Sequence, residues 1–113
     1  MSISTHVLDT AEGRPAAGVG VVLEALTSDG GWQRIGRTST NDDGRAPDLT
    51  TDDTTIVPGV YRVSFETGEW FTARDVQAFY PVVRIVFEIT DGDAHHHVPL
   101  LLSPFGYSTY RGS

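Results

Sequence analysis

Apolar and polar residues alternate along most of this chain, and a period of two is typical of β-strands that are buried on one face. In VYRVSFET, for example, Tyr61, Val63 and Phe65 share one face while polar residues occupy the other. The segments that show this pattern are residues 19–26, 32–39, 60–67 and 82–90. Several short strands separated by Gly, Pro and Asp predict an antiparallel β-sandwich or small barrel, formed as one domain by residues 1–113.

One segment departs from the alternating pattern. GEWFTARDVQAF, residues 68–79, has the composition of a short helix. Pro81 would end that helix before the next strand, because proline cannot continue a helix. The sequence therefore predicts one short helix beside the strands.

The last predicted strand, HHHVPLLL, is apolar on both of its faces. One face presents His96, Val98, Leu100 and Leu102, and the other presents His95, His97, Pro99 and Leu101. A strand with one solvent-exposed face would carry polar residues on that face. We therefore expect a second layer, either a loop or another subunit, to cover the outer face of this strand. Pro99 cannot donate to a ladder of hydrogen bonds, which favours an edge strand or a bulge.

The amino-acid composition excludes several classes of function for this chain. The chain has 113 residues, of which 39% are hydrophobic and 20% charged, as expected of a globular domain without a membrane span. A formal net charge of -7 argues against non-specific binding to nucleic acid. The lack of cysteine excludes disulfides, thiolate metal sites and a cysteine nucleophile. The start, MSISTHVLDT, lacks a secretory signal, so we expect a cytoplasmic location.

The acidic residues are concentrated in TNDDGRAPDLTTDDTT, residues 40–55, which we interpret as a solvated loop. The aspartates there are Asp42, Asp43, Asp48, Asp52 and Asp53. The stretch does not follow the twelve-residue calcium-loop pattern with a closing glutamate, so a calcium site is not favoured.

The histidines admit several interpretations from the residues alone. His97 would by default be a half-buried histidine that bonds to a backbone carbonyl. His95 and His97 lie on the same strand face, and with His6 they could bind a catalytic zinc. An H-x-H pair is common, however, and its spacing has little specificity.

Three separated stretches together resemble a known family. They are STHVLDTAEGRPAAGVGVVLEAL, TNDDGR and HVPLLLSPFGYSTYRGS. The chain resembles, from Ser4 to Ser113, the transthyretin-related family that includes the 5-hydroxyisourate hydrolases, and the ending YRGS distinguishes those enzymes from the hormone carrier. The resemblance implies an all-β, prealbumin-like sandwich of two four-stranded sheets with a short helix after the fifth strand. It also implies a homotetramer, a dimer of dimers, with clefts at the dimer–dimer interface and with no metal or cofactor.

The resemblance also implies a set of site residues. The catalytic positions fall on His6, Arg45 and His97, and the substrate-binding ending falls on Tyr110, Arg111, Gly112 and Ser113. Two positions depart from the family pattern. His96 and Trp70 each stand where a tyrosine is usual, and His96 points away from His97, so we expect the cleft to be intact.

The expected reaction is hydrolysis of 5-hydroxyisourate to 2-oxo-4-hydroxy-4-carboxy-5-ureidoimidazoline in urate breakdown. A neutral histidine can take a proton from water near pH 7, and either His6 or His97 is a candidate for this role. Arg45 offers a planar fork of donors to a ring that is rich in carbonyl oxygens. No G-x-S-x-G motif is present, which favours direct attack by water. The alternatives are a small-ligand carrier on the same scaffold and a zinc hydrolase.

Overall fold

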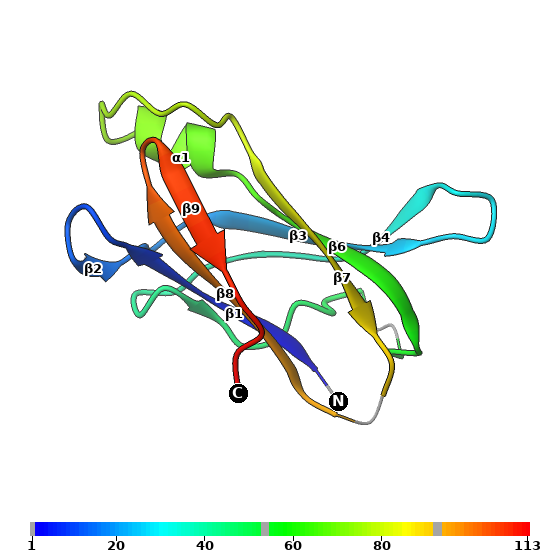
Figure 1. Cartoon of the computed structure of the whole chain (residues 1–113). Helices are drawn as coiled ribbons and strands as arrows, with labels where there is room; N and C mark the ends of the chain where they lie inside the picture. The colour runs from blue at the N-terminus through cyan, green and yellow to red at the C-terminus, as the bar shows by residue number, and fades with distance from the viewer. Residues whose placement is uncertain (1, 53–54, 92–93) are drawn as a thin grey trace.

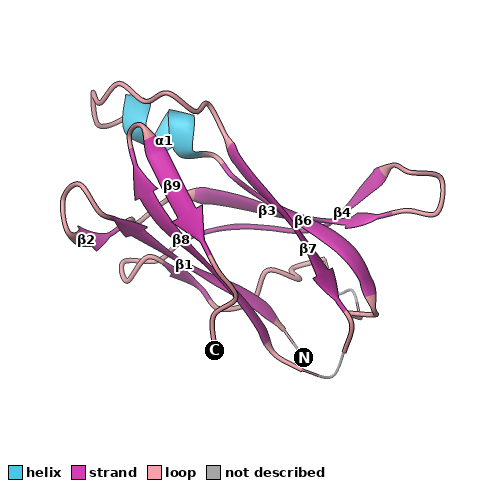
Figure 2. Ribbon diagram, in the orientation of Figure 1, coloured by secondary structure: helices cyan, strands magenta, loops and turns pink. Residues whose placement is uncertain are grey.

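Two β-sheets pack face to face in a computed structural model that describes residues 2–52, 55–91 and 94–113 (Figures 1 and 2). The elements of the described chain are β1 (Ile3–Asp9), β2 (Arg14–Pro15), β3 (Gly20–Leu26), β4 (Trp32–Ser39), β5 (Arg45–Ala46), β6 (Gly59–Phe65), α1 (Thr67–Thr72), β7 (Val83–Ile89), β8 (His96–Ser103) and β9 (Gly106–Thr109). Both ends of the chain lie at one end of the sandwich, and α1 lies at the other (Figure 1). No described helix has the length and apolarity needed to cross a membrane.

The strand order confirms the predicted sandwich and adds one short strand to it. The first sheet has the order β2-β1-β8-β9, and the second has the order β4-β3-β6-β7. The two-residue strand β5 also pairs with β1, so the first sheet has five strands rather than four. Strands β2 and β5 occupy different parts of the same β1 edge, because β2 pairs with Leu8 and Asp9 while β5 pairs with Thr5 and His6.

The alternating pattern places the core between the two sheets. Tyr61, Val63 and Phe65 of β6 are buried, as their spacing predicts. From the first sheet, Val7 of β1 and Leu100 of β8 are fully buried in the same cluster. The hydrophobic effect of this burial stabilises the sandwich, and it leaves the outer face of the first sheet available for polar side chains.

The pairing of β1 with β8 is parallel, and it joins the first and last parts of the chain. Its register sets Ser4 beside His97 and His6 beside Pro99. Paired residues of adjacent strands project their side chains to the same face of a sheet. The two histidines therefore share the outer face of the first sheet.

The helix is shorter than the sequence pattern predicts. It ends at Thr72 instead of continuing to Phe79. The N–H groups of Asp75 and Val76 close the end by bonding to the carbonyls of Thr72 and Phe71, and Asp75 takes a left-handed backbone with φ of 59°. A residue in this conformation stops the helix, and the rest of the segment forms a loop.

Pro99 was expected on an edge strand or at a bulge. Strand β8 lies inside its sheet, between β1 and β9, so the edge alternative is wrong. The ladder with β9 nevertheless stops at Leu100, one residue after Pro99, and resumes in the same register where His97 pairs with Gly112. Pro99 has no N–H to donate, and its carbonyl accepts a bond from the Thr109 hydroxyl at 2.7 Å instead. The proline thus interrupts a pairing that extends from β9 into the C-terminal residues.

Candidate active site

A tight turn before β5 positions Arg45. The Asn41 Oδ1 atom accepts the N–H groups of Asp43 and Arg45 at 2.9 and 3.0 Å. Gly44 has φ of 74°, and a Cβ there would lie 2.4 Å from the carbonyl oxygen of Val7. Only glycine allows this approach, which lets the turn dock on β1 through the Val7 N–H bond to the Gly44 carbonyl at 2.7 Å.

The outer face of the first sheet forms a hollow of about 220 Å³. Its lining brings Arg45 of β5 and His97 of β8 together with Ser113 at the end of the chain. The other lining residues are Ser4, Thr5, Pro47 and His95. Three segments that are far apart in the sequence therefore meet at one polar depression.

His97 has one bonded ring nitrogen and one free. Its Nδ1 lies 2.8 Å from the Ser4 hydroxyl, and its Nε2 has no hydrogen-bond partner among the described residues. Burial lowers the pKa of His97 below the usual histidine value, and the positive charges of Arg45, His95 and His6 lower that pKa further. A hydrogen bond to the Ser4 backbone acts in the opposite direction. The ring is consequently neutral at pH 7 and can accept a proton.

Arg45 is exposed, and its guanidinium forms no ion pair with any of the described residues. In the β1–β5 register it stands directly opposite His6. A guanidinium without a carboxylate partner offers its fork of N–H donors to a bound molecule.

His6 is held differently from His97. Its Nε2 lies 2.9 Å from the Asp43 carbonyl oxygen, and a carbonyl can only accept, so Nε2 carries the hydrogen. The ring is half-buried and does not line the hollow. His6 thus connects the turn that positions Arg45 to strand β1.

Three of the four C-terminal residues line two hollows, and the fourth, Gly112, packs on His97. Gly112 donates its N–H to the His97 carbonyl at 2.9 Å, and a Cβ on Gly112 would lie 2.5 Å from Cδ2 of His97. The His97 ring therefore occupies the space that a side chain at position 112 would need. Tyr110 and Arg111 line a neighbouring hollow of about 220 Å³ between β7 and β8, which His97 also borders, while Ser113 lines the first hollow.

Comparison with known proteins assigns the chain to a family. A model of the HIUase/Transthyretin family matches residues 3–112. The chain belongs to the HIUase/Transthyretin family. It is 48% identical over 112 residues to a probable 5-hydroxyisourate hydrolase of Caenorhabditis elegans, which covers 99% of this chain and 81% of the relative.

Similar solved structures include both a 5-hydroxyisourate hydrolase and a transthyretin. The 5-hydroxyisourate hydrolase of Klebsiella pneumoniae superposes with a TM-score of 0.87 at 34% identity and covers all of both chains. Sea bream transthyretin in complex with thyroxine superposes with a TM-score of 0.92, also at 34% identity, over 99% of this chain and 95% of that one. The shared fold does not separate a hydrolase from a thyroxine-binding protein, so the side chains of the hollow must do so.

Sequence reasoning missed Ser4, which contacts both His95 and His97. Its hydroxyl lies 3.0 Å from Nε2 of His95 and 2.8 Å from Nδ1 of His97. The signal was present, since S-x-H in the first strand and H-x-H in the last both repeat with period two. Only the parallel register of β1 with β8 shows that these two patterns meet.

The described residues contain no group of three His, Cys, Asp or Glu side chains placed to hold one metal ion. The proposed zinc ligands His95, His97 and His6 are thus not assembled as a metal site, and the zinc alternative gains no support. In the acidic stretch, Asp48 accepts two bonds from Thr50, and Asp52 pairs with Arg34 at 3.3 Å. Asp53 lies outside the described residues.

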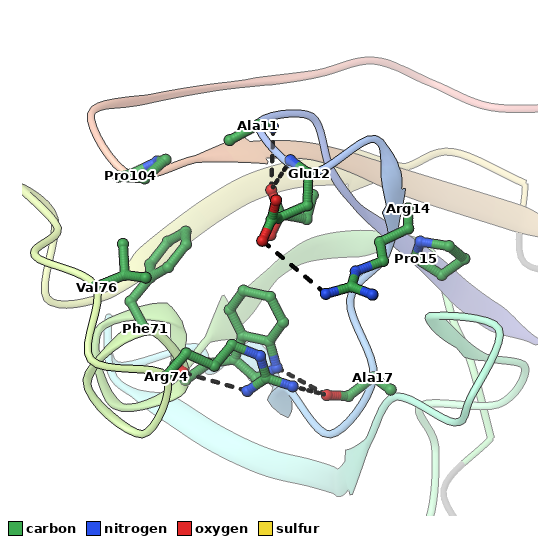
Figure 3. A pocket seen from close by; sticks show the side chains of 11 residues that line it. Ala11, Glu12, Arg14, Pro15, Ala17, Phe71, Arg74, Val76 and Pro104 are labelled. Atoms are coloured by element: carbon green, nitrogen blue, oxygen red, sulfur yellow. Dashed lines mark hydrogen bonds and ion pairs between the residues drawn. The ribbon is translucent and has the colours of Figure 1, made fainter.

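A larger hollow of about 550 Å³ lies at the opposite end of β8, next to α1 (Figure 3). Its polar groups bond to one another. The Arg74 guanidinium stacks 3.8 Å from the centre of the Trp70 ring, and both side chains donate to the Ala17 carbonyl. Glu12 faces Arg14 at 3.9 Å. The bonds to Ala17 anchor the helical segment to the turn between β2 and β3, and they show how tryptophan is accommodated at position 70.

Proposed function

We propose that this protein hydrolyses 5-hydroxyisourate to 2-oxo-4-hydroxy-4-carboxy-5-ureidoimidazoline in urate breakdown. The observation that supports this most directly is that a neutral His97 with a free Nε2 and an Arg45 without an ion-pair partner line the same hollow. The family assignment and the similarity to curated 5-hydroxyisourate hydrolases favour this reaction over the carrier alternative.

The chemistry requires a base and a group that stabilises an oxyanion. The oxygen of a water molecule attacks the carbonyl carbon of the activated ring amide while one of its protons moves to Nε2 of His97. Arg45 donates hydrogen bonds to the carbonyl oxygen as negative charge develops on it. The ring C–N bond then breaks, His97 returns its proton to the leaving nitrogen, and the new carboxyl group releases the second proton to solvent.

His97 is a better candidate for the base than His6. The Nε2 of His6 already donates to the Asp43 carbonyl, and the ring does not line the hollow. We assign His6 to holding the turn that positions Arg45. Gly112 and Ser113 form the wall beside His97, and Tyr110 and Arg111 extend that wall toward the second hollow.

We further propose that the active unit is a homotetramer, a dimer of dimers, whose clefts lie at the dimer–dimer interface. Arg45 and His95 are exposed in the single chain, so the hollow lacks a cover. The outer strands β7 and β9 leave Val86 and Tyr107 58% and 42% exposed. Light scattering should give four chains per particle, whereas a fully active monomer would contradict this arrangement. The cytoplasmic location stays a prediction from sequence.

The decisive experiment follows the ultraviolet absorbance of freshly generated 5-hydroxyisourate. Wild type, His97→Asn and a wild-type sample treated with a chelator are compared with the spontaneous decay. We expect fast decay that survives the chelator and is lost in His97→Asn. Decay no faster than the spontaneous reaction would overturn the proposal and favour a carrier, and loss of activity with the chelator would overturn metal independence.

A further inference from the structure

The Ser4 hydroxyl lies between two histidine rings. It is 2.8 Å from Nδ1 of His97 and 3.0 Å from Nε2 of His95, and the Ser2 hydroxyl is 2.7 Å from Nδ1 of His95. Ser4 is only 7% exposed, whereas His95 is exposed at the rim of the hollow. The four side chains form a continuous series of hydrogen bonds from the hollow to the surface.

Counting hydrogens leaves two arrangements for this series. A serine hydroxyl has one hydrogen, and a neutral imidazole has one N–H, so all the bonds must run in the same direction. In the outward arrangement, His97 donates through Nδ1 to Ser4, Ser4 donates to Nε2 of His95, and His95 donates through Nδ1 to Ser2. In this arrangement Nε2 of His97 carries no hydrogen and has a free lone pair. In the inward arrangement, Nε2 of His97 carries the hydrogen and cannot accept a proton.

Arg45 favours the outward arrangement. Its guanidinium borders the same hollow as the His97 ring. Because Nδ1 of His97 is bonded to Ser4, the ring nitrogen without a partner is Nε2. A nearby fixed positive charge favours a lone pair over an N–H on that nitrogen, which places the hydrogen on Nδ1.

We propose that Ser4 and His95 are positioning residues that hold His97 in its Nδ1–H tautomer, so that Nε2 is free to act as the base. In serine proteases a buried carboxylate orients the catalytic histidine in the same way. Here a neutral hydroxyl, itself held by a second histidine, performs that role. The catalytic consequence rests on the proposed function, but the tautomer itself does not.

The tautomer can be measured without any substrate. In the full chain labelled with ¹⁵N-histidine, the nitrogen shifts of His97 at a pH where the ring is neutral should show the Nδ1–H tautomer. Ser4→Ala should shift His97 toward the Nε2–H tautomer, and Ser4→Thr, which keeps the hydroxyl, should restore the wild-type shifts. An Nε2–H tautomer in wild type would overturn the proposal.

Kinetics test the consequence of that tautomer. Removing the hydroxyl should lower kcat roughly 10- to 100-fold, less than the loss of a carboxylate orienter, with KM unchanged within about twofold. In Ser4→Ala, protonated His97 loses the hydroxyl oxygen that accepts its Nδ1–H. Its pKa should therefore fall, and the acid limb of the pH profile should move to lower pH. Ser4→Thr should recover most of kcat, and His95→Phe should have a smaller effect in the same direction.

Ser103→Ala on β8 is the matched control. It also removes one serine hydrogen bond, to the Gly106 carbonyl at 3.0 Å, but it lies at the far end of the strand. We expect its kcat and pH profile to equal those of wild type. An unchanged kcat and pH profile in Ser4→Ala would refute the positioning role. If wild type showed no hydrolysis, the proposed function would fail, and the ¹⁵N shifts would still decide the tautomer.

Discussion

His96 and His97 are neighbours on β8, yet their side chains lie in opposite environments. His96 is 7% exposed in the space between the sheets, and its Nδ1 has no hydrogen-bond partner among the described residues. His97 is half-buried on the outer face, with Nδ1 bonded to Ser4 and Nε2 free at the hollow. The alternation of side chains across a strand is the cause of this difference. The same residue type is therefore a cost to stability on one face and a candidate base on the other.

The two faces also differ in what they demand of a side chain. A buried polar atom without a partner costs about 1–3 kcal/mol, so the interior face favours apolar replacements. On the outer face, Arg45 borders the same hollow as His97, and the Ser4 hydroxyl bonds to the His97 ring. The proposed mechanism requires an imidazole in the correct tautomer at that position.

The sharpest test of this contrast places the same substitution at both positions. His97→Phe removes the base and should lower turnover roughly 10²- to 10⁴-fold, whereas His96→Phe should leave turnover near that of wild type. Decay of 5-hydroxyisourate measures both variants, and far-ultraviolet circular dichroism shows that each is folded. Equal losses in the two variants would mean that the faces are not functionally distinct.

A smaller loss is expected when the wall beside His97 is displaced. Gly112→Ala would set a Cβ 2.5 Å from Cδ2 of His97 and 3.0 Å from Cγ of Pro99, so either the ring or the tail must move. Misplacement of a catalytic group typically lowers turnover, here by about tenfold or more. Gly106→Ala is the control, because its Cβ would meet only the Ser103 hydroxyl at 3.8 Å. Wild-type turnover in Gly112→Ala would show that the tail can be displaced without consequence.

The pH dependence should report the environment of His97. Because burial and nearby positive charge lower its pKa, kcat/KM should keep its full value to pH values below the ordinary histidine pKa of 6.5 before it falls. The unfolded chain takes up this proton first as the pH falls, so the free energy of unfolding should decrease between pH 6.5 and the lower folded-state pKa. An acid limb at or above pH 6.5 would contradict the lowered pKa.

The sequence pattern was sufficient for local features and insufficient for long-range ones. Alternation predicted the buried face of β6 at Tyr61, Val63 and Phe65, because burial of a strand face depends on nearby residues. The parallel pairing of β1 with β8 depends on residues from opposite ends of the chain, so no local pattern could predict that Ser4 contacts His97.

Two local predictions failed because other contacts in the fold overrode them. Composition alone does not show that the backbone at Asp75 turns left-handed and that α1 ends at Thr72. Pro99 was expected at an edge or a bulge, but it lies inside the sheet, where its carbonyl accepts a bond from the Thr109 hydroxyl. The candidate site residues were predicted by resemblance, whereas the hydrogen bond of His97 to Ser4 required the three-dimensional register.

The smallest expected effect is the change in the free energy of unfolding when His96 on the interior face is replaced. His96→Phe removes the buried Nδ1 that lacks a partner, while an aromatic ring of similar shape still fills the space near Val98 and Ile85. The relief of an unsatisfied polar atom is partly offset by the slightly larger ring, so we expect a gain of about 1 kcal/mol in the free energy of unfolding. Urea denaturation at neutral pH measures the gain, with His96→Gln as a variant that keeps a buried polar group and should show no increase. Destabilisation by phenylalanine would mean that His96 has a polar partner in the assembled protein. The interior face of β8 would then also require a polar side chain, and the contrast with the outer face would fail.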